Sequence, residues 1–275
     1  MGSGERPPVI GFLTDFGLDG AAAVCRGVML SICPDAQIVD ISHTIRKYAV
    51  RDGAFVLRAT LPYLPVGVHV GVVDPGVGTA RRPIGVRVAR GDVLVGPDNG
   101  LLLPAADALG GAVEARELTN RDLWLPAVSS TFHGRDLFAP VAAHLAAGDA
   151  SFENVGTEIP VTGVVRLPAP RPRASDGLLE TEVTYVDSFG NLRLAGGPDD
   201  LAAAFGRLED RRLIARVGAV ELGEVAFVPS FGHVVESEIV LYVDSSGDLA
   251  LAVNQGDLAS RTGAVTGTPV SLERP

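Results

Sequence analysis

The first half of the chain alternates between short apolar runs and longer segments whose apolar residues have helical spacing. The runs at 9–13, 37–41 and 69–73 have the length and composition of buried β-strands, and helices are predicted between them at 21–32 and 52–61. Strands separated by helices pair mainly in parallel, and the helices cover both faces of the sheet. We therefore expect an N-terminal α/β domain with a mainly parallel sheet. A ligand of such a sheet lies beyond the carboxyl ends of its strands.

Polar side chains directly follow each of these predicted strands. Asp15 comes after the first, His43 after the second and Asp74 after the third. Because the carboxyl ends of parallel strands meet at one edge of a sheet, we expect all three side chains to line one crevice.

A Pro- and Gly-rich loop, VVDPGVGTAR at 72–81, connects the third strand to a further strand predicted at 84–88. Asp74 lies where the first of these strands stops, Pro75 stiffens the backbone, and two glycines allow angles that other residues avoid. Arg81 follows at a distance that lets it turn back toward Asp74. A carboxylate and a guanidinium on one stiff loop make a plausible reactive pair. The alternative is a structural turn with a surface salt bridge, which would contribute little.

A second polar segment, SSTFHGRD at 129–136, precedes a helix predicted at 137–147, and a strand is predicted earlier, at 93–95. His133 and Gly134 would then lie at or just before a helix N-terminus, where free backbone N–H groups favour an anion or a polarised oxygen. The alternative for His133 is a capping or core histidine. Asp136 is expected to be a first-turn acid that suits the helix dipole.

The clearest break in composition is PAPRPRASD at 168–176, which we take as the boundary between a domain at 1–168 and a smaller β-rich domain at 177–275. Predicted strands of the second domain lie at 180–186, 213–217, 240–243 and 250–253. Polar clusters rich in Asp, Asn, Ser and Gly follow three of them, at 187–191, 244–247 and 254–257. On spacing alone these clusters are β-turns.

Composition excludes several classes of protein. The net charge of −10 over 275 residues argues against a nucleic-acid partner, because no general basic field is present to neutralise phosphates. No apolar run reaches the roughly 18 residues of a membrane span, and the first residues do not resemble an export signal. Cys25 and Cys33 have neither the spacing of metal ligands nor the density of a disulfide scaffold. We expect a cytoplasmic protein that binds neither nucleic acid nor membrane.

Several motifs, in register along nearly the whole chain, together resemble one family. They are LTDFG at 13–17, VDPGVGTAR at 73–81, GPDNGLL at 96–102, TFHGRD at 131–136, DSFGN at 187–191 and AVNQG at 252–256. The chain resembles the S-adenosyl-L-methionine hydroxide adenosyltransferases, relatives of the fluorinase and chlorinase enzymes. The resemblance implies an α/β N-terminal domain and a β-rich C-terminal domain. It also implies a homotrimer with its sites between subunits, and a reaction of S-adenosyl-L-methionine with water that gives adenosine and L-methionine.

The resemblance also implies a role for individual residues. Asp74, Arg81 and His133 match the family's water-activating triad, and Asp15 matches the acid that binds the ribose hydroxyls. Positions implied to contact the rest of the substrate are Tyr48, Gly134, Asp187 near the amino group, Phe189 and Asn191 around the adenine, Ser245 and Ser246 at the carboxylate, and Asn254 and Gln255 at the adenine edge. Halogenating relatives have an arginine at the position of Ser246, and the fluorinase has a tyrosine and a serine at those of Asp74 and Gly134.

The implied chemistry needs neither metal nor cofactor. Attack at ribose C5′ displaces a neutral thioether from a sulfonium, so no acid is required for the leaving group, and the difficulty lies in the weak nucleophile. His133 and Asp74 are both candidates to take the proton from water, and the sequence leaves that choice open. Three alternatives to hydrolysis remain: a halide-using adenosyltransferase, a non-catalytic S-adenosylmethionine or adenosine binding module, and a metal-dependent phosphohydrolase. The last lacks the ligand spacing of a helical metal motif.

Overall fold

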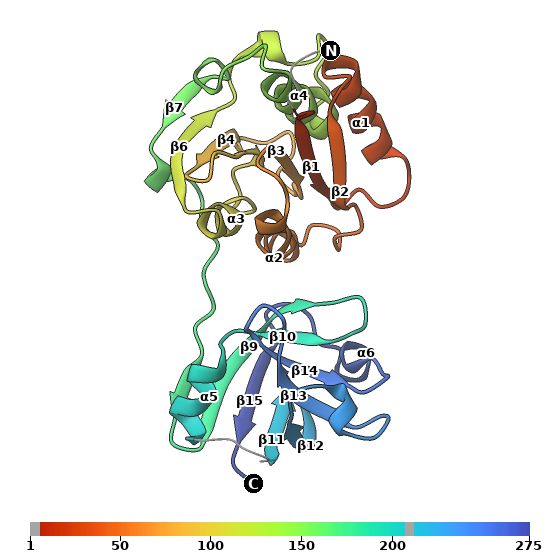
Figure 1. Ribbon diagram of the computed structural model, residues 1–275, viewed down its shortest axis with the longest axis vertical. Coiled ribbons are helices and arrows are strands. Elements are labelled where there is room, and N and C mark those ends of the chain that lie inside the picture. The colour runs from red at the N-terminus through yellow and green to blue at the C-terminus, as the bar shows by residue number, and fades with distance from the viewer. Residues whose placement is uncertain (1–5, 207–211) are drawn as a thin grey trace. The chain divides into compact units, whose positions relative to one another are not determined.

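The computed structural model describes residues 6–206 and 212–275 and divides into two compact units, 1–167 and 168–275. Each unit has its own sheet and its own apolar core (Figure 1). The expected fold class, an α/β unit followed by a smaller β-rich unit, is confirmed. In the described residues no helix is long and apolar enough to cross a membrane.

The first unit is built on a seven-stranded sheet of order β2-β1-β3-β5-β4-β6-β7. Its strands are β1 (Val9–Thr14), β2 (Gln37–Ser42), β3 (Val68–Val72), β4 (Pro83–Val88), β5 (Val93–Pro97), β6 (Ala112–Glu117) and β7 (Thr157–Ile159). The pairs within β2-β1-β3-β5 are parallel, as expected, whereas the pairs from β5 through β4 and β6 to β7 are antiparallel. The link between β4 and β5 is too short to cross over the sheet, so these two strands form a hairpin.

Helices cover both faces of this sheet, as Figure 1 shows. The helix α1 (Ala21–Ile32) and the helix α4 (Ala139–Ala147) pack on one face. On the other face lie α2 (Val50–Thr60) and α3 (Leu103–Ala108). Because β1, β3 and β5 are buried from both sides, their backbones fix the loops that leave their carboxyl ends.

A buried polar cluster lies at the opposite, amino end of these parallel strands. His69, near the start of β3, bonds through Nε2 to Asp92 Oδ1 at 2.9 Å, and both side chains are fully buried. Arg90 donates Nε to Asp92 Oδ2 at 2.7 Å and also donates to the carbonyl oxygens of Leu61 and Pro62. Burial alone would raise the pKa of Asp92, but the hydrogen bonds from His69 and Arg90 lower it below its ordinary value.

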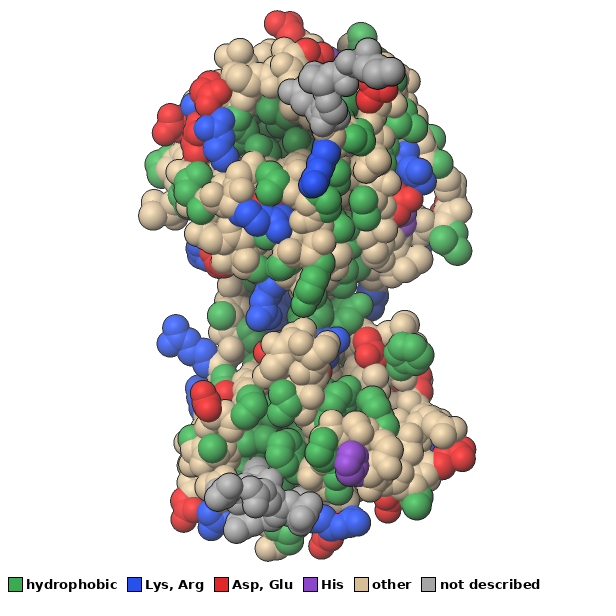
Figure 2. Space-filling model, in the orientation of Figure 1, with side chains coloured by type: hydrophobic (Ala, Val, Ile, Leu, Met, Phe, Trp, Pro, Cys, Tyr) green, Lys and Arg blue, Asp and Glu red, His purple; other side chains and the backbone are tan. Residues whose placement is uncertain are grey.

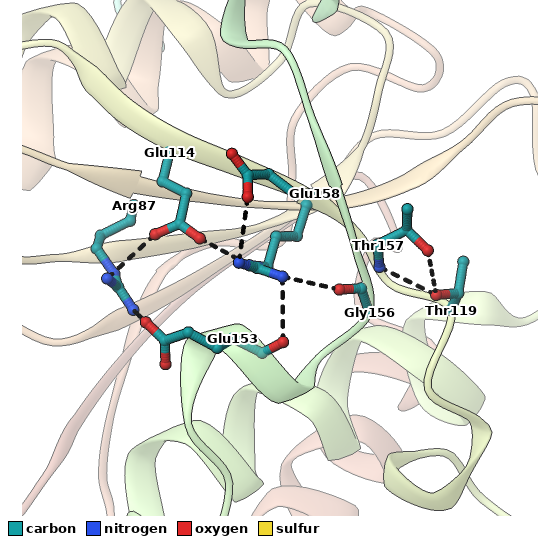
Figure 3. A network of polar contacts seen from close by, with 8 residues as sticks. Arg87, Glu114, Thr119, Glu153, Gly156, Thr157 and Glu158 are labelled. Atoms are coloured by element: carbon teal, nitrogen blue, oxygen red, sulfur yellow. Dashed lines mark hydrogen bonds and ion pairs between the residues drawn. The ribbon is translucent and has the colours of Figure 1, made fainter.

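Charged side chains hold together the antiparallel edge of the first unit (Figure 3). Arg87 on β4 bonds to Glu114 on β6 at 3.1 Å and to Glu153 at 2.6 Å, and Arg116 bonds to Glu114 at 2.7 Å and Glu158 at 3.6 Å. Charges beside an edge strand discourage unwanted pairing with another chain. On the face shown in Figure 2, Lys and Arg side chains are dispersed among acidic and apolar ones.

The second unit is an eight-stranded sheet of order β10-β14-β13-β12-β11-β15-β9-β8. Its elements are β8 (Arg173–Ser175), β9 (Leu178–Val186), β10 (Leu192–Leu194), α5 (Pro198–Phe205), β11 (Arg212–Val217), β12 (Val220–Phe227), β13 (Ile239–Val243), β14 (Leu249–Val253), α6 (Leu258–Thr262) and β15 (Pro269–Glu273). Because β10 pairs with both β14 and β9, the sheet closes into a barrel. The segment 168–176, predicted as the boundary between the domains, contains the strand β8. This strand belongs to the second unit, because it pairs with β9.

Candidate active site

The loop after β3 brings Asp74 and Arg81 together. Inside the loop, Val77 N–H donates to the carbonyl oxygen of Asp74 at 3.3 Å, and Thr79 Oγ1 donates to that of Gly76 at 2.7 Å. Gly78 has a φ of 75°, and a Cβ added there would lie 2.3 Å from the carbonyl oxygen of Ser130. A glycine is therefore required where this loop packs against the segment that carries His133.

Arg81 is the central member of a buried triad. Its Nε donates to Asp74 Oδ1 at 3.1 Å, its Nη2 donates to Asp74 Oδ2, and Nη2 also lies 3.2 Å from His133 Nδ1. The side chains of Arg81 and Asp74 are only 7% and 5% exposed, and the guanidinium packs 5.3 Å from the ring centre of Phe138. The surface salt bridge considered from the sequence is therefore wrong. The pair is buried, where a charge interaction is far less screened.

His133 lies in this triad as a neutral imidazole with a defined tautomer. A guanidinium can only donate, so Nδ1 of His133 accepts from Arg81 and the ring proton lies on Nε2. Burial lowers the pKa of His133 below its ordinary value, and the charge of Arg81 lowers it further, while Asp74 and Asp136 oppose the shift. Among the described residues Nε2 of His133 has no hydrogen-bond partner, so it remains available to a ligand.

The segment that presents His133 is held by Asp136, which lies in the first helical turn as expected from the sequence but is bonded within the fold. Asp136 is fully buried, accepts the backbone N–H of Ser129 at 2.7 Å, and bonds to Arg135 Nε at 2.5 Å. A short π-helix at Gly134–Phe138 precedes α4, and Asp136 is one of its buried residues. Such short π-helices are frequent at functional sites.

Asp15 and Tyr48 form the other side of the site. Asp15 follows β1, and its Oδ2 accepts the backbone N–H of Tyr48 at 2.8 Å. Tyr48 has a φ of 66°, unusual for a residue other than glycine, and its side chain is 69% exposed. Oδ1 of Asp15 has no hydrogen-bond partner in the part of the chain that the structure describes. The carboxylate can therefore still accept hydrogen bonds from a ligand.

These side chains line a pocket of about 240 Å³ in the first unit. Its lining includes Asp15, Tyr48, Asp74, His133 and Gly134, as expected from the sequence. It also includes Phe16, Lys47, Val72, Val77, Thr131 and Phe132. The described residues contain no group of three or more His, Cys, Asp or Glu side chains able to hold a metal ion.

His43 does not line this pocket, so that prediction is wrong. Its Nδ1 lies 2.9 Å from Thr14 Oγ1 and its Nε2 lies 3.1 Å from Asp40 Oδ1, while its ring packs edge-on against Phe12. Thr14 Oγ1 in turn accepts the backbone N–H of Phe16 at 3.2 Å. His43 therefore supports the loop that carries Asp15 and Phe16.

The polar clusters of the second unit are turns, and Asp187 and Asp244, from two of these clusters, both lie near Tyr242. Asp187 Oδ1 accepts the N–H groups of Phe189 and Asn191 at 2.9 and 3.0 Å, and its Oδ2 accepts Asn191 Nδ2 at 2.9 Å. The ring of Phe189 is left 75% exposed. Burial raises the pKa of Tyr242, and the nearby charges of Asp187 and Asp244 raise it while that of Arg193 lowers it. Asp187, Arg193 and Asp244 therefore all lie near Tyr242.

The remaining candidates of the second unit follow β13 and β14. Asp244 Oδ1 accepts the backbone N–H of Ser246 at 2.7 Å, and Arg193 bonds to Asp244 with Nη1 3.5 Å from Ser246 Oγ. Asn254 Nδ2 donates to the carbonyl oxygen of Val234 at 3.0 Å. Gln255 has a φ of 55°, which is unusual for a residue other than glycine. Such backbone conformations cluster at functional sites. Ser245 lies in the Asp244 turn.

The two units also match two known domains. Residues 10–156 match the model of the SAM hydroxide adenosyltransferase N-terminal domain, and residues 181–271 match that of the C-terminal domain. The chain belongs to the SAM hydroxide adenosyltransferase family.

Relatives support the same assignment. The chain is 47% identical to an (R)-S-adenosyl-L-methionine hydrolase of Salinispora tropica over 94% of its own length and 95% of that protein, and 38% identical to one of Thermus thermophilus over 95% and 98%. It is 31% identical to a fluorinase of Actinoplanes sp. over 97% and 98%. An uncharacterized conserved protein from Thermotoga maritima has a crystal structure that matches with a TM-score of 0.86 and 37% identity, over 96% of this chain and all of that one.

The sequence did not single out Phe16 and Lys47, which line the pocket, or Arg193, which lies close to Ser246. Phe16 and Lys47 are direct neighbours of the predicted residues Asp15 and Tyr48. This position next to predicted residues could have indicated them. However, the side chains of adjacent residues often point in opposite directions. For Arg193, the available indication was the motif DSFGN at 187–191. This motif directly precedes β10, the strand that carries Arg193.

Proposed function

We propose that this chain hydrolyses S-adenosyl-L-methionine. Water attacks ribose C5′ as the C5′–S bond breaks, the bonding electrons stay on sulfur, and adenosine and L-methionine form with release of one proton. The observation that carries the proposal is the buried Arg81, which joins Asp74 to His133 at the wall of a pocket that also contains Asp15. The hydrolase relatives are named for the (R)-sulfonium epimer, and we propose the same preference here.

The hydrogen bonds of the triad suggest how the proton leaves. Nδ1 of His133 accepts from Arg81, so the neutral ring presents Nε2–H, a donor that orients the water oxygen but cannot take a proton. The carboxylate of Asp74 is then the acceptor. Each of its oxygens has a lone pair left after the bonds from Arg81. Arg81 holds the carboxylate in place and its charge favours the developing hydroxide.

The other site residues bind the substrate. Asp15 accepts the ribose hydroxyls, and Tyr48 and Gly134 bound the nucleoside in the first unit. In the second unit Asp187 faces the methionine ammonium, Ser245 and Ser246 bind the carboxylate, and Phe189, Asn191, Asn254 and Gln255 contact the adenine. Arg193, close to Ser246, places a cation where the carboxylate would lie.

The required groups are divided between the two units, so we propose a homotrimer in which the first unit of one subunit and the second unit of another complete each site. Mixing inactive Asp74→Ala protein with inactive Asn191→Ala protein should then restore activity after subunit exchange. Failure despite proven exchange would place the site within one chain.

We also propose a cytoplasmic enzyme that uses no metal or cofactor. Both cysteines are free and buried, which suits a reducing compartment. Turnover should be the same after treatment with EDTA, and a loss that zinc or magnesium restores would favour the metal-dependent alternative.

Water rather than halide is the proposed nucleophile. Stripping a halide of its water is costly, and the carboxylate of Asp74 on the pocket wall repels an anion strongly at the low effective dielectric of a buried site. Gly134 supplies no hydroxyl donor, but the chlorinase relatives also carry glycine at this position, so the choice between water and halide rests on Asp74. The purified protein should be incubated with the separated (R) and (S) epimers, with and without chloride or fluoride, and the products separated by chromatography. Adenosine and methionine from the (R) epimer are expected in every case. A 5′-halogenated nucleoside at a comparable rate would favour the halide-using alternative, and substrate binding without any product would favour the binding module.

A further inference from the structure

Phe16 is a pocket residue to which the resemblance assigns no role. It follows Asp15 in the loop after β1, and its side chain lines the pocket together with Asp74, His133 and Gly134. Its backbone N–H donates to Thr14 Oγ1, and the next residue, Gly17, donates to the carbonyl oxygen of His43 at 2.7 Å. The loop is therefore fixed on both sides of the ring.

Gly134 and Phe16 compete for the same space. A Cβ added to Gly134 would lie 2.8 Å from Phe16 Cζ and 3.3 Å from Cε2. The first distance is shorter than carbon atoms approach in proteins, so any side chain at 134 must displace the ring. Gly134 is buried and lies in the short π-helix next to His133. A side chain at 134 therefore fits only if the ring of Phe16 moves.

On one side the ring of Phe16 has a close neighbour, so it would move toward the pocket. Phe132 packs edge-on against it, with ring centres 5.7 Å apart. Behind Gly134 lies Cys25 of α1, fully buried, whose Sγ would be 3.7 Å from the added Cβ. Burial raises the pKa of Cys25 to about 12, so this thiol is an inert part of the wall.

We propose that Phe16 and Gly134 form a coupled specificity pair that fits the site to water. This inference rests on the proposed hydrolysis. The ring of Phe16 fills the volume beside His133 and offers no hydrogen-bond donor there. The ring excludes further solvent from this side, where the nucleophile meets His133 and the backbone N–H groups of residues 133 and 134. A donor side chain at 134 fits only when the ring at 16 becomes smaller.

A double-mutant cycle tests the coupling. We expect Gly134→Ser to lower kcat by about 30-fold, because the displaced ring enters the pocket, and Phe16→Leu to lower it by only about 3-fold. The double variant Phe16→Leu/Gly134→Ser should regain at least about 10-fold in kcat over Gly134→Ser, with a smaller change in KM.

The matched control is Gly27→Ser in α1, where an added Cβ meets nothing within 4 Å; it should keep wild-type turnover. Thermal melting shows whether each variant is folded. If Gly134→Ser does not fold, Gly134→Ala is used in the same cycle, since it brings the clashing Cβ without the hydroxyl. Additive effects of the two substitutions, with no rescue, would overturn the specificity pair. Absence of adenosine from the wild-type protein would instead overturn the proposed hydrolysis.

Discussion

Two sets of Asp, Arg and His side chains in the first unit have a buried carboxylate, and they lie at opposite ends of the parallel strands. In a third set, Asp40 bonds to Arg26 and His43 but is more exposed. At the amino end, Asp92 is the central member: it bonds to His69 on one side and to Arg90 on the other. Arg90 also donates to two backbone carbonyls, whereas Nδ1 of His69 is buried without a hydrogen-bond partner among the described residues. A cluster of this kind joins strands and loops.

At the carboxyl end the order of bonding is different. Arg81 is the central member, between Asp74 and His133. The carboxylate and the imidazole do not bond to each other, and both line a pocket. The same three residue types therefore make a structural cluster when the carboxylate is central and a candidate reactive site when the guanidinium is central. Six variants can break or sharpen this comparison.

The largest difference is expected from the two aspartates. Asp74→Asn removes the proposed proton acceptor, and we expect turnover to fall by about 10³-fold. The matched variant Asp92→Asn should leave the kcat of the folded enzyme unchanged. Steady-state adenosine formation measures both. Near-normal turnover in Asp74→Asn would contradict the proposed role.

For folding stability, the larger effect is instead expected from the substitution at Asp92. Asp92→Asn leaves the guanidinium of Arg90 without its carboxylate, and removing one member of a buried ion pair costs about 3 kcal/mol of unfolding free energy. Because the pKa of Asp92 is lowered in the folded state, its contribution is complete above the ordinary aspartate pKa and is lost as the pH falls further. Urea unfolding between neutral and acidic pH measures this. The variant should lose less stability on acidification than the wild type, and an equal loss would show that Asp92 contributes nothing to it.

The role of His133 can be resolved by its choice of replacement. His133→Ala should reduce turnover strongly, whereas His133→Gln keeps an amide N–H close to the position of Nε2. If His133 serves as a donor, the glutamine variant should be about 10-fold faster than the alanine variant. His69→Gln is the control, with wild-type kcat expected. Equal activities of the two His133 variants would restore His133 as a candidate for the base.

Much of this arrangement could be predicted from the sequence, because short apolar runs and helical periodicity fixed the strands and helices of the parallel half. The loop of Asp74 and Arg81 was predictable because two glycines and one proline leave few ways to turn. His43 was mispredicted because lying after a strand does not decide where a side chain points, and here Thr14 and Asp40 bind it. Asp136 lies in the first helical turn as predicted, but its burial was not foreseen, because the sequence does not show the π-helical geometry of Gly134–Phe138. Phe16 was missed because its contact with Gly134 joins distant parts of the chain.

The smallest effect expected is a shift of pH dependence. Burial and the charge of Arg81 lower the pKa of His133, so the neutral form should persist below the ordinary histidine pKa of about 6.5. The acid limb of kcat/KM, which reports the free enzyme, should therefore lie below that value. Arg81→Gln removes one lowering influence and leaves Asp74, which raises the pKa, uncompensated.

The imidazole of His133 should then titrate at higher pH in the variant, which NMR of the histidine ring can follow even where turnover is slow. The sign can be checked independently by folding stability. Below pH about 6.5 the unfolded chain binds a proton that folded His133 does not, so His133 makes stability fall with decreasing pH between the unfolded and folded pKa values. Removing Arg81 raises the pKa of His133 in the folded state. The pH range over which His133 makes stability fall therefore becomes shorter at its acidic end. If the ring titrates at the same pH with and without Arg81, the guanidinium does not control its protonation, and the contrast between the two clusters loses its electrostatic basis.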